Sequence, residues 1–190
     1  AIMERRDLEA IAEVLRGTNI IVLSDEIYAE LTYGGRHMSI ANIPDMYIRT
    51  LVVNGFSKAY AMTGWRLGFV CGPRELIKQM VKIHQYAIMC APTTSQYAAV
   101  EALRNGDGDI ASMCRDYDYR RRFLLEKLRG AGLDCFEPRG AFYMFPCIRS
   151  TGMSSADFCA RFLTEEHVAA IPGTAFGAGG EGFVRDRKSV

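Results

Sequence analysis

The sequence has almost no net charge, no long apolar segment and no clustered cysteine or histidine residues. Its 23 basic and 22 acidic side chains leave a formal net charge of +1, so a general electrostatic attraction to nucleic acid or to an acidic membrane is not expected. No apolar run approaches the roughly 18 residues that predict a membrane-spanning helix. We therefore expect neither a nucleic-acid partner nor a membrane.

The cysteines and histidines also lack the spacing of a metal site. None of the six cysteines forms a C-x-x-C pair, and the three histidines lie far apart, which argues against zinc and against a disulfide framework. Free thiols are typical of a reducing compartment. The stretch AIMERRDLEA is charged and lacks the apolar core of a signal peptide. We therefore expect a cytoplasmic protein without a metal.

The first half of the sequence contains helix and strand patterns in alternation. MERRDLEAIAEVLRG (3–17) predicts a helix with Leu8, Ile11, Ala12 and Leu15 on one face. The next stretch, NIIVL, is rich in β-branched residues and predicts a buried strand. Further strands are expected over 49–57 and 66–72, and further helices from residue 73 and over 91–106. Such alternation is typical of an α/β layer structure.

The second half has a different pattern. Its longest helical stretch covers 108–132, and it is followed by short strands within 134–148, a helix over about 155–166 and a strand over 167–173. This order predicts a smaller α+β unit. We therefore expect two domains, residues 1–108 and residues 109–190.

Asp25 and Tyr28 follow the first predicted strand in the segment SDEIY. In α/β sheets, ligands bind at the carboxyl ends of the strands. A carboxylate at that position can pair with a cationic ring nitrogen, and a nearby phenol can hydrogen-bond a neighbouring oxygen. The simpler interpretation is an ordinary aspartate that caps a turn at the end of a strand.

Ser57, Lys58 and Arg66 lie in NGFSKAYAMTGWRLG, where the next predicted strand ends. A partly buried lysine loses its proton more easily, and its neutral amine can form a Schiff base with a carbonyl. The planar guanidinium of an arginine suits a phosphate, and a serine hydroxyl adds a donor. A surface lysine beside a structural arginine is the alternative.

Arg185, in GGEGFVR, follows a glycine-rich stretch. An arginine there can bind a carboxylate through a pair of hydrogen bonds, or it can be an exposed arginine without a ligand. Taken together, the polar positions meet the needs of pyridoxal phosphate and of an amino-acid substrate. The cofactor needs a lysine for its aldehyde, an acid for its ring nitrogen and donors for its phosphate, and the substrate needs a cation for its carboxylate.

At these positions the sequence resembles the class I/II aminotransferases, pyridoxal-phosphate-dependent enzymes of fold type I. GFSKAYAMTGWRLG resembles the lysine attachment signature of that family, SDEIYAEL resembles its cofactor-ring segment, and APTTSQYAA is also similar. The resemblance implies that residues 1–108 are the carboxyl-terminal part of the large cofactor-binding domain. It implies that residues 109–190 are the small α+β domain.

The resemblance also implies a role for each candidate residue. Lys58 would form the internal aldimine with pyridoxal phosphate and then carry the proton between substrate and cofactor. Asp25 would keep the ring nitrogen protonated, and Tyr28 would hydrogen-bond the ring hydroxyl oxygen. Ser57 and Arg66 would bind the phosphate, and Arg185 would bind the substrate carboxylate. The implied reaction moves an amino group from an amino acid to a 2-oxo acid, in an enzyme that is commonly a homodimer.

The sequence departs from the family pattern at both ends. The glycine-containing phosphate loop, the stacked aromatic residue and the NPTG motif of the family do not precede AIMERRDL, and DRKSV after Arg185 does not resemble the apolar strand of the family. We therefore expect an incomplete fragment that binds the cofactor weakly and has little or no activity alone. We also expect Arg185 to lack the strand that would orient it.

Two other functions are compatible with the same motifs. A carbon–sulfur β-lyase would use Lys58 and Asp25 in the same early steps, but it would release pyruvate and ammonia. An aminotransferase-like domain of a transcription regulator would lie behind a helix-turn-helix, and no such basic segment is visible in these residues.

Overall fold

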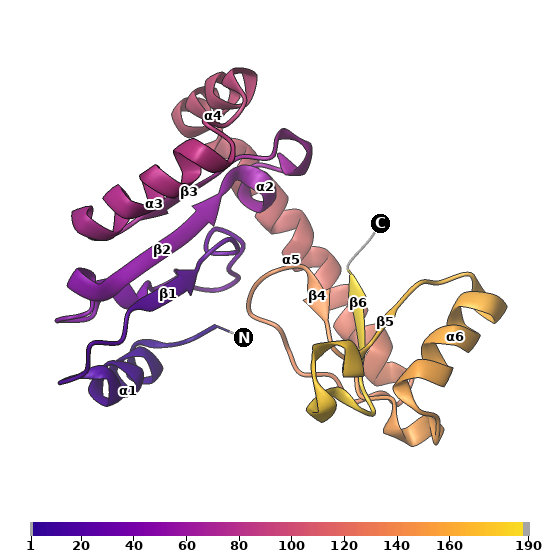
Figure 1. Cartoon of the computed structure of the whole chain (residues 1–190). Helices are drawn as coiled ribbons and strands as arrows, with labels where there is room; N and C mark the ends of the chain where they lie inside the picture. The colour runs from indigo at the N-terminus through magenta and orange to yellow at the C-terminus, as the bar shows by residue number, and fades with distance from the viewer. Residues whose placement is uncertain (1, 188–190) are drawn as a thin grey trace. The chain divides into compact units, whose positions relative to one another are not determined.

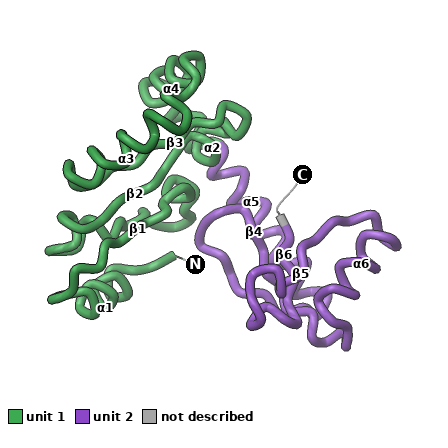
Figure 2. Tube along the Cα trace, in the orientation of Figure 1, with its two compact units in different colours: residues 1–112 green, residues 113–190 purple. Residues whose placement is uncertain are grey.

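The computed structural model describes residues 2–187, which form two compact units. The first unit comprises residues 1–112 and the second residues 113–190 (Figure 2). The division falls within the long helix α5 (Asp107–Gly130). The assignment of residues 1–108 and 109–190 to a cofactor-binding domain and a small domain stays a prediction.

A three-stranded sheet forms the centre of the first unit, in the order β1-β2-β3. β1 (Val22–Asp25) runs parallel to β2 (Thr50–Gly55), and β3 (Gly68–Cys71) runs antiparallel to β2 (Figure 1). The carboxyl ends of β1 and β2 and the amino end of β3 therefore lie at one edge of the sheet. This edge is where an α/β sheet is expected to bind its ligands.

The helices of the first unit follow the sequence patterns closely. They are α1 (Arg5–Leu15), α2 (Phe56–Ala59), α3 (Arg74–Ala87) and α4 (Thr93–Asn105), with 3-10 turns at Ile40–Asn42, Tyr47–Arg49 and Thr63–Trp65. α1 places Leu8 and Ala12 in one apolar cluster, together with Ile40, Ile43 and Met46. A second cluster, at the end of β2, consists of Phe56, Met62 and Ala99.

The strand predicted over residues 19–23 is displaced along the chain and is not buried. β1 begins at Val22, Leu23 is 67% exposed, and Ile20 and Ile21 are also exposed. The predicted strand shares only Val22 and Leu23 with β1, and within residues 2–187 no other segment covers the apolar side chains of Ile20, Ile21 and Leu23. α3 likewise has no buried residue.

The second unit contains the remainder of α5, the helix α6 (Ser155–Glu166) and a small antiparallel sheet in the order β4-β6-β5. The strands are β4 (Tyr143–Met144), β5 (Ile171–Pro172) and β6 (Val184–Arg187), and 3-10 turns cover Arg149–Thr151, Gly173–Phe176 and Ala178–Gly180. α6 confirms the helix predicted over about 155–166. The core of the second unit consists of two clusters. One contains Leu125, Cys135 and Met144, and the other contains Ile148, Cys159 and Val184.

Among the described residues 2–187, no helix is both long and apolar enough to cross a membrane. The same part of the chain holds no group of three or more His, Cys, Asp or Glu side chains arranged to bind a metal ion.

Candidate active site

The sheet topology brings together the two polar segments that the sequence keeps apart. Asp25 ends β1 opposite Val53 of the parallel strand β2, and Lys58 follows the end of β2. Arg66 precedes β3, whose first residue, Gly68, pairs with Gly55 at the end of β2. The candidate residues of the first unit therefore share one edge of one sheet.

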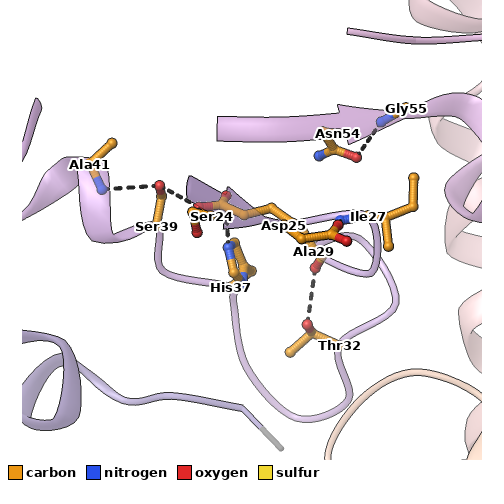
Figure 3. A network of polar contacts seen from close by, with 11 residues as sticks. Ser24, Asp25, Ile27, Ala29, Thr32, His37, Ser39, Ala41, Asn54 and Gly55 are labelled. Carbon is orange, nitrogen blue, oxygen red and sulfur yellow. Dashed lines mark hydrogen bonds and ion pairs between the residues drawn. The ribbon is translucent and has the colours of Figure 1, made fainter. Parts of the chain in front are cut away.

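Asp25 occupies the turn that follows β1. Its Oδ1 accepts a hydrogen bond of 3.2 Å from the backbone N–H of Ile27, so Asp25 does cap a turn, while its side chain stays exposed (Figure 3). No ion pair within the described residues engages this carboxylate, whose Oδ2 remains available to a ligand. Tyr28, in the same turn, is half-buried. Turn capping and cofactor binding are therefore compatible at Asp25.

The junction of β2 and α2 holds Lys58 in place through its neighbours. Phe56 and Ala59 are buried, and Ser57 and Lys58 lie half-buried between them. Gly55 allows a close approach of β2 and β3, because a Cβ there would lie 3.0 Å from Gly68 Cα and 3.0 Å from the carbonyl oxygen of Leu67. Two buried side chains and a tight strand crossing thus fix the backbone that carries Lys58.

Tyr60 packs against the same junction, with its ring 5.4 Å from that of Phe56. Burial raises the pKa of the Tyr60 phenol, and the carboxylates of Asp107 and Glu30 raise this pKa further. The Tyr60 ring packs against the apolar cluster of Phe56, Met62 and Ala99 at this junction.

Arg66 lies in a strained backbone conformation next to this junction. Its φ is +51°, in the left-handed region, which costs roughly 1–2 kcal/mol for a residue with a Cβ. The side chain is exposed, and its Nη1 donates a hydrogen bond of 2.8 Å to the carbonyl oxygen of Thr63. Ser95 anchors the loop by donating a hydrogen bond of 2.7 Å to the carbonyl oxygen of Trp65. The left-handed backbone of Arg66, and its lack of an ion pair in the described residues, keep it a candidate for a ligand-binding role.

These residues fit pyridoxal phosphate by the chemistry of their side chains. A lysine amine, an exposed carboxylate, a serine hydroxyl and a guanidinium that uses one of its donors within residues 2–187 lie at one sheet edge. The amine suits the aldehyde of the cofactor, and the carboxylate suits its ring nitrogen. The hydroxyl and the guanidinium both suit its phosphate. The donor set within the first unit is therefore suited to this cofactor.

Arg185 lies in the second unit, in the central strand of the small sheet. It belongs to β6 and pairs with Ile171 of β5, so the expectation that it would lack an orienting strand is wrong. The polar residues Asp186 and Arg187 continue β6 because β4 supplies their backbone partners. Lys188–Val190, the rest of the DRKSV segment, lie outside the described residues.

Aromatic rings surround the Arg185 guanidinium. Its Cζ lies 4.7 Å from the centre of the Tyr143 ring and 4.5 Å from that of Phe176. The Tyr143 ring of β4 and the Phe176 ring of the turn Gly173–Phe176 thus hold the guanidinium through cation–π contacts. Its edge still presents N–H donors to a carboxylate.

A buried acidic residue beside Asp25 was not predicted from the sequence. Glu26 is 7% exposed, and its carboxylate contacts the side chains of Ser24, His37 and Ser39. Figure 3 shows Ser24, His37 and Ser39 gathered at the end of β1. No sequence periodicity links residues 26, 37 and 39, because an irregular loop joins them. The only available signal was the run of polar residues in SDEIY.

Comparisons with known proteins show which sequences the chain resembles. The sequence profile of the family described as "Aminotransferase class I and II" matches residues 1–185. The YugH protein of Bacillus subtilis strain 168 is 51% identical to the chain over 185 residues, which is 97% of this chain and 48% of YugH. An aspartate aminotransferase of Pyrococcus abyssi is 45% identical over 188 residues, with coverage of 97% and 48%.

A solved structure is also similar in three dimensions. The aromatic aminotransferase from Pyrococcus horikoshii OT3 superposes with a TM-score of 0.95 and 44% identity, covering 100% of this chain and 52% of the other. The chain spans about half the length of the curated relatives it matches.

Proposed function

The chain belongs to the class I and II aminotransferase family, whose members are pyridoxal phosphate enzymes of fold type I, and from this premise we propose that it serves amino-group transfer. The proposed reaction moves an amino group from an amino acid to a 2-oxo acid. The observation that carries the proposal is the meeting of Asp25 and Tyr28 with Ser57, Lys58 and Arg66 at one edge of the first sheet.

Each residue has a role that its local structure supports. The cofactor, when bound, supplies an aldehyde for the amino nitrogen and a cationic ring that withdraws electrons from the substrate carbon. The Asp25 carboxylate accepts the hydrogen bond of the protonated ring nitrogen, and Tyr28 hydrogen-bonds the ring oxygen. Ser57 and Arg66 bind the phosphate. Lys58 provides the amine that holds the aldehyde and later moves the proton at the substrate carbon.

The remaining assignments rest on the family and on local environment. We propose that Arg185 binds the substrate carboxylate, which is supported by its guanidinium held against Tyr143 and Phe176. A homodimer and a cytoplasmic location are part of the same proposal. The free state of all six cysteines supports the reducing location.

The decisive experiment identifies the lysine that reacts with the cofactor. The purified chain is mixed with pyridoxal phosphate, its visible spectrum is recorded, and borohydride then converts the bond between amine and aldehyde into a stable one. Peptide mapping should place the adduct on Lys58, and Lys58→Ala should abolish it. Lys78→Ala, which alters an exposed lysine of α3, should leave it intact.

An adduct spread evenly over exposed lysines, and unchanged in Lys58→Ala, would contradict the proposal. Product analysis with an amino acid and a 2-oxo acid separates the reaction classes. A new amino acid supports transfer, whereas pyruvate and ammonia indicate a β-lyase.

A further inference from the structure

Glu26 is a buried acidic residue to which the proposed function assigns no role. Its side chain is 7% exposed. Oε1 accepts hydrogen bonds from the hydroxyls of Ser24, at 3.0 Å, and Ser39, at 2.6 Å. Oε2 lies 2.9 Å from Nε2 of His37. A buried carboxylate is costly unless it is fully hydrogen-bonded, so these contacts are required for Glu26 to occupy this position.

The contacts of Glu26 join the two ends of one loop. Ser24 belongs to β1, whereas His37 and Ser39 lie at the far end of residues 26–39, just before the 3-10 turn Ile40–Asn42. The Ser39 side chain also accepts a hydrogen bond from the backbone N–H of Ala41, the second residue of that turn (Figure 3). The Glu26 carboxylate therefore closes a loop that has no strand or α-helix of its own.

The backbone of Glu26 is fixed on the opposite side. Its N–H donates a hydrogen bond of 2.8 Å to the carbonyl oxygen of Val53 in β2, which extends the β1–β2 pairing beyond Asp25. Its carbonyl oxygen accepts a hydrogen bond from the N–H of Ala29. Glu26 thus lies between Asp25 and Tyr28 and is held through both its side chain and its main chain.

An apolar residue would fill the same space without the cost of a buried charge, because well-packed apolar groups often replace buried ionic ones without loss of stability. A carboxylate with three directional partners differs in that it fixes the orientation of the segment as well as its burial. Orientation matters here because Asp25 and Tyr28 lie in the same turn as Glu26. In the proposed function, both of these residues contact the cofactor.

We propose that Glu26, together with His37 and Ser39, is a positioning residue that holds Asp25 and Tyr28 in the orientation that the cofactor ring requires. This inference rests on the proposed function of Asp25 and Tyr28. Glu26 does not contact the cofactor, and it acts through the backbone of residues 25–28. The contribution of Glu26 is therefore to cofactor affinity rather than to a proton-transfer step.

The first test measures order in the segment without any cofactor. Hydrogen exchange is compared between the wild-type chain, Glu26→Gln and Glu26→Leu. Glu26→Leu should accelerate exchange of the amides within 26–39 with little change in β2, and Glu26→Gln should largely restore protection because its amide retains the hydrogen-bonding shape. Unchanged protection of 26–39 in Glu26→Leu would overturn the proposal.

The second test measures cofactor affinity by titration of the chain with pyridoxal phosphate. The control is Leu8→Ala, which destabilises the apolar cluster of α1 in the same unit and removes none of the hydrogen bonds of Glu26. Glu26→Leu should weaken binding by at least about tenfold, as expected when a supporting residue is lost, and Leu8→Ala should weaken it far less at a similar loss of thermal stability. Equal weakening in both variants would show a merely structural role and would overturn the proposal.

A milder variant guards against failure of Glu26→Leu to fold. His37 is partly exposed, so His37→Leu removes one contact of the carboxylate with less disturbance of the core. It should lower affinity and protection in the same direction, and His37→Gln should recover part of both. If wild-type chain and Lys58→Ala bind the cofactor alike, the proposed function fails, and hydrogen exchange still decides whether Glu26 orders residues 26–39.

Discussion

A single missing side chain determines how closely β2 and β3 approach beside Lys58. Gly55 has extended backbone angles that any residue can adopt, so its requirement is for space. A Cβ at this position would lie 3.0 Å from two backbone atoms, Gly68 Cα and the Leu67 carbonyl oxygen, and backbone cannot move as a flexible side chain can. Gly55 is therefore a packing position that serves the site.

We expect Gly55→Ala to destabilise the first unit by about 1–3 kcal/mol, the usual cost of overpacking. Urea unfolding followed by the fluorescence of Trp65, the only tryptophan, measures this loss. Gly64→Ala is the matched control, because nothing lies within 4 Å of a Cβ at Gly64. Equal urea midpoints for the two variants would show that β2 and β3 separate freely.

The six free thiols should differ in reactivity according to their burial. Burial raises the pKa values of Cys135 and Cys159, and a raised pKa leaves less of the reactive thiolate near neutral pH. Cys71 and Cys90 are exposed. Limited alkylation at pH 7 followed by mass spectrometry should therefore find Cys71 and Cys90 modified first. Early modification of Cys135 or Cys159 in the folded chain would contradict this order.

At the scale of helices and strands, local sequence patterns predicted most elements. They failed where a strand depends on pairing with distant strands. α6 was predicted because Ser155–Glu166 has a helical pattern, and α4 ends at Gly106 as expected. β6 was not expected to continue past Arg185, because its residues are polar and its stability comes from β4 and β5. Asp25, Lys58 and Arg66 could be proposed as site residues from the sequence because each lies beside the end of a recognisable strand. The buried network of Glu26 could not be predicted, because its partners lie across an irregular loop.

An ionic network links α5 to the segment that follows it. Arg121, whose side chain is 8% exposed, pairs with Asp118 at 2.7 Å and with Glu137 at 2.6 Å. Burial alone would raise the pKa of Asp118, but hydrogen bonds from Arg121 and Arg122 outweigh it and hold this pKa below its usual value. Asp118 therefore stabilises the second unit in its ionised form.

This lowered pKa predicts a loss of stability in acid. The contribution of Asp118 is fully present above about pH 4, the ordinary aspartate pKa, and is lost as the pH falls through the lower folded value. Hydrogen exchange of amides 118–130 should accelerate as the pH falls through this window, after correction for intrinsic rates. Asp118→Asn should weaken protection at pH 7 and flatten the pH dependence. Asp116→Asn, which changes an exposed residue without an ion pair in the described part of α5, should do neither.

At the scale of the whole molecule, an unusual number of large apolar side chains are exposed on α3 and the segment after it. Ile83 is 73% exposed, Tyr86 91% and Met89 78%. Surfaces of this kind on an isolated chain favour association, because their contact with one another removes apolar area from water. No residue of α3 is buried by the rest of residues 2–187.

We therefore expect the isolated chain to self-associate in a concentration-dependent manner that Ile83→Glu reduces. A charge at this position opposes contact between apolar faces, whereas Lys82→Glu changes the charge of the neighbouring exposed residue and leaves the apolar side chains in place. Sedimentation velocity over a range of concentrations measures the effect, and binding of an apolar dye should fall in parallel for Ile83→Glu alone. If both variants reduced association equally, charge rather than apolar area would be its cause. If neither did, the contact would lie elsewhere on the surface.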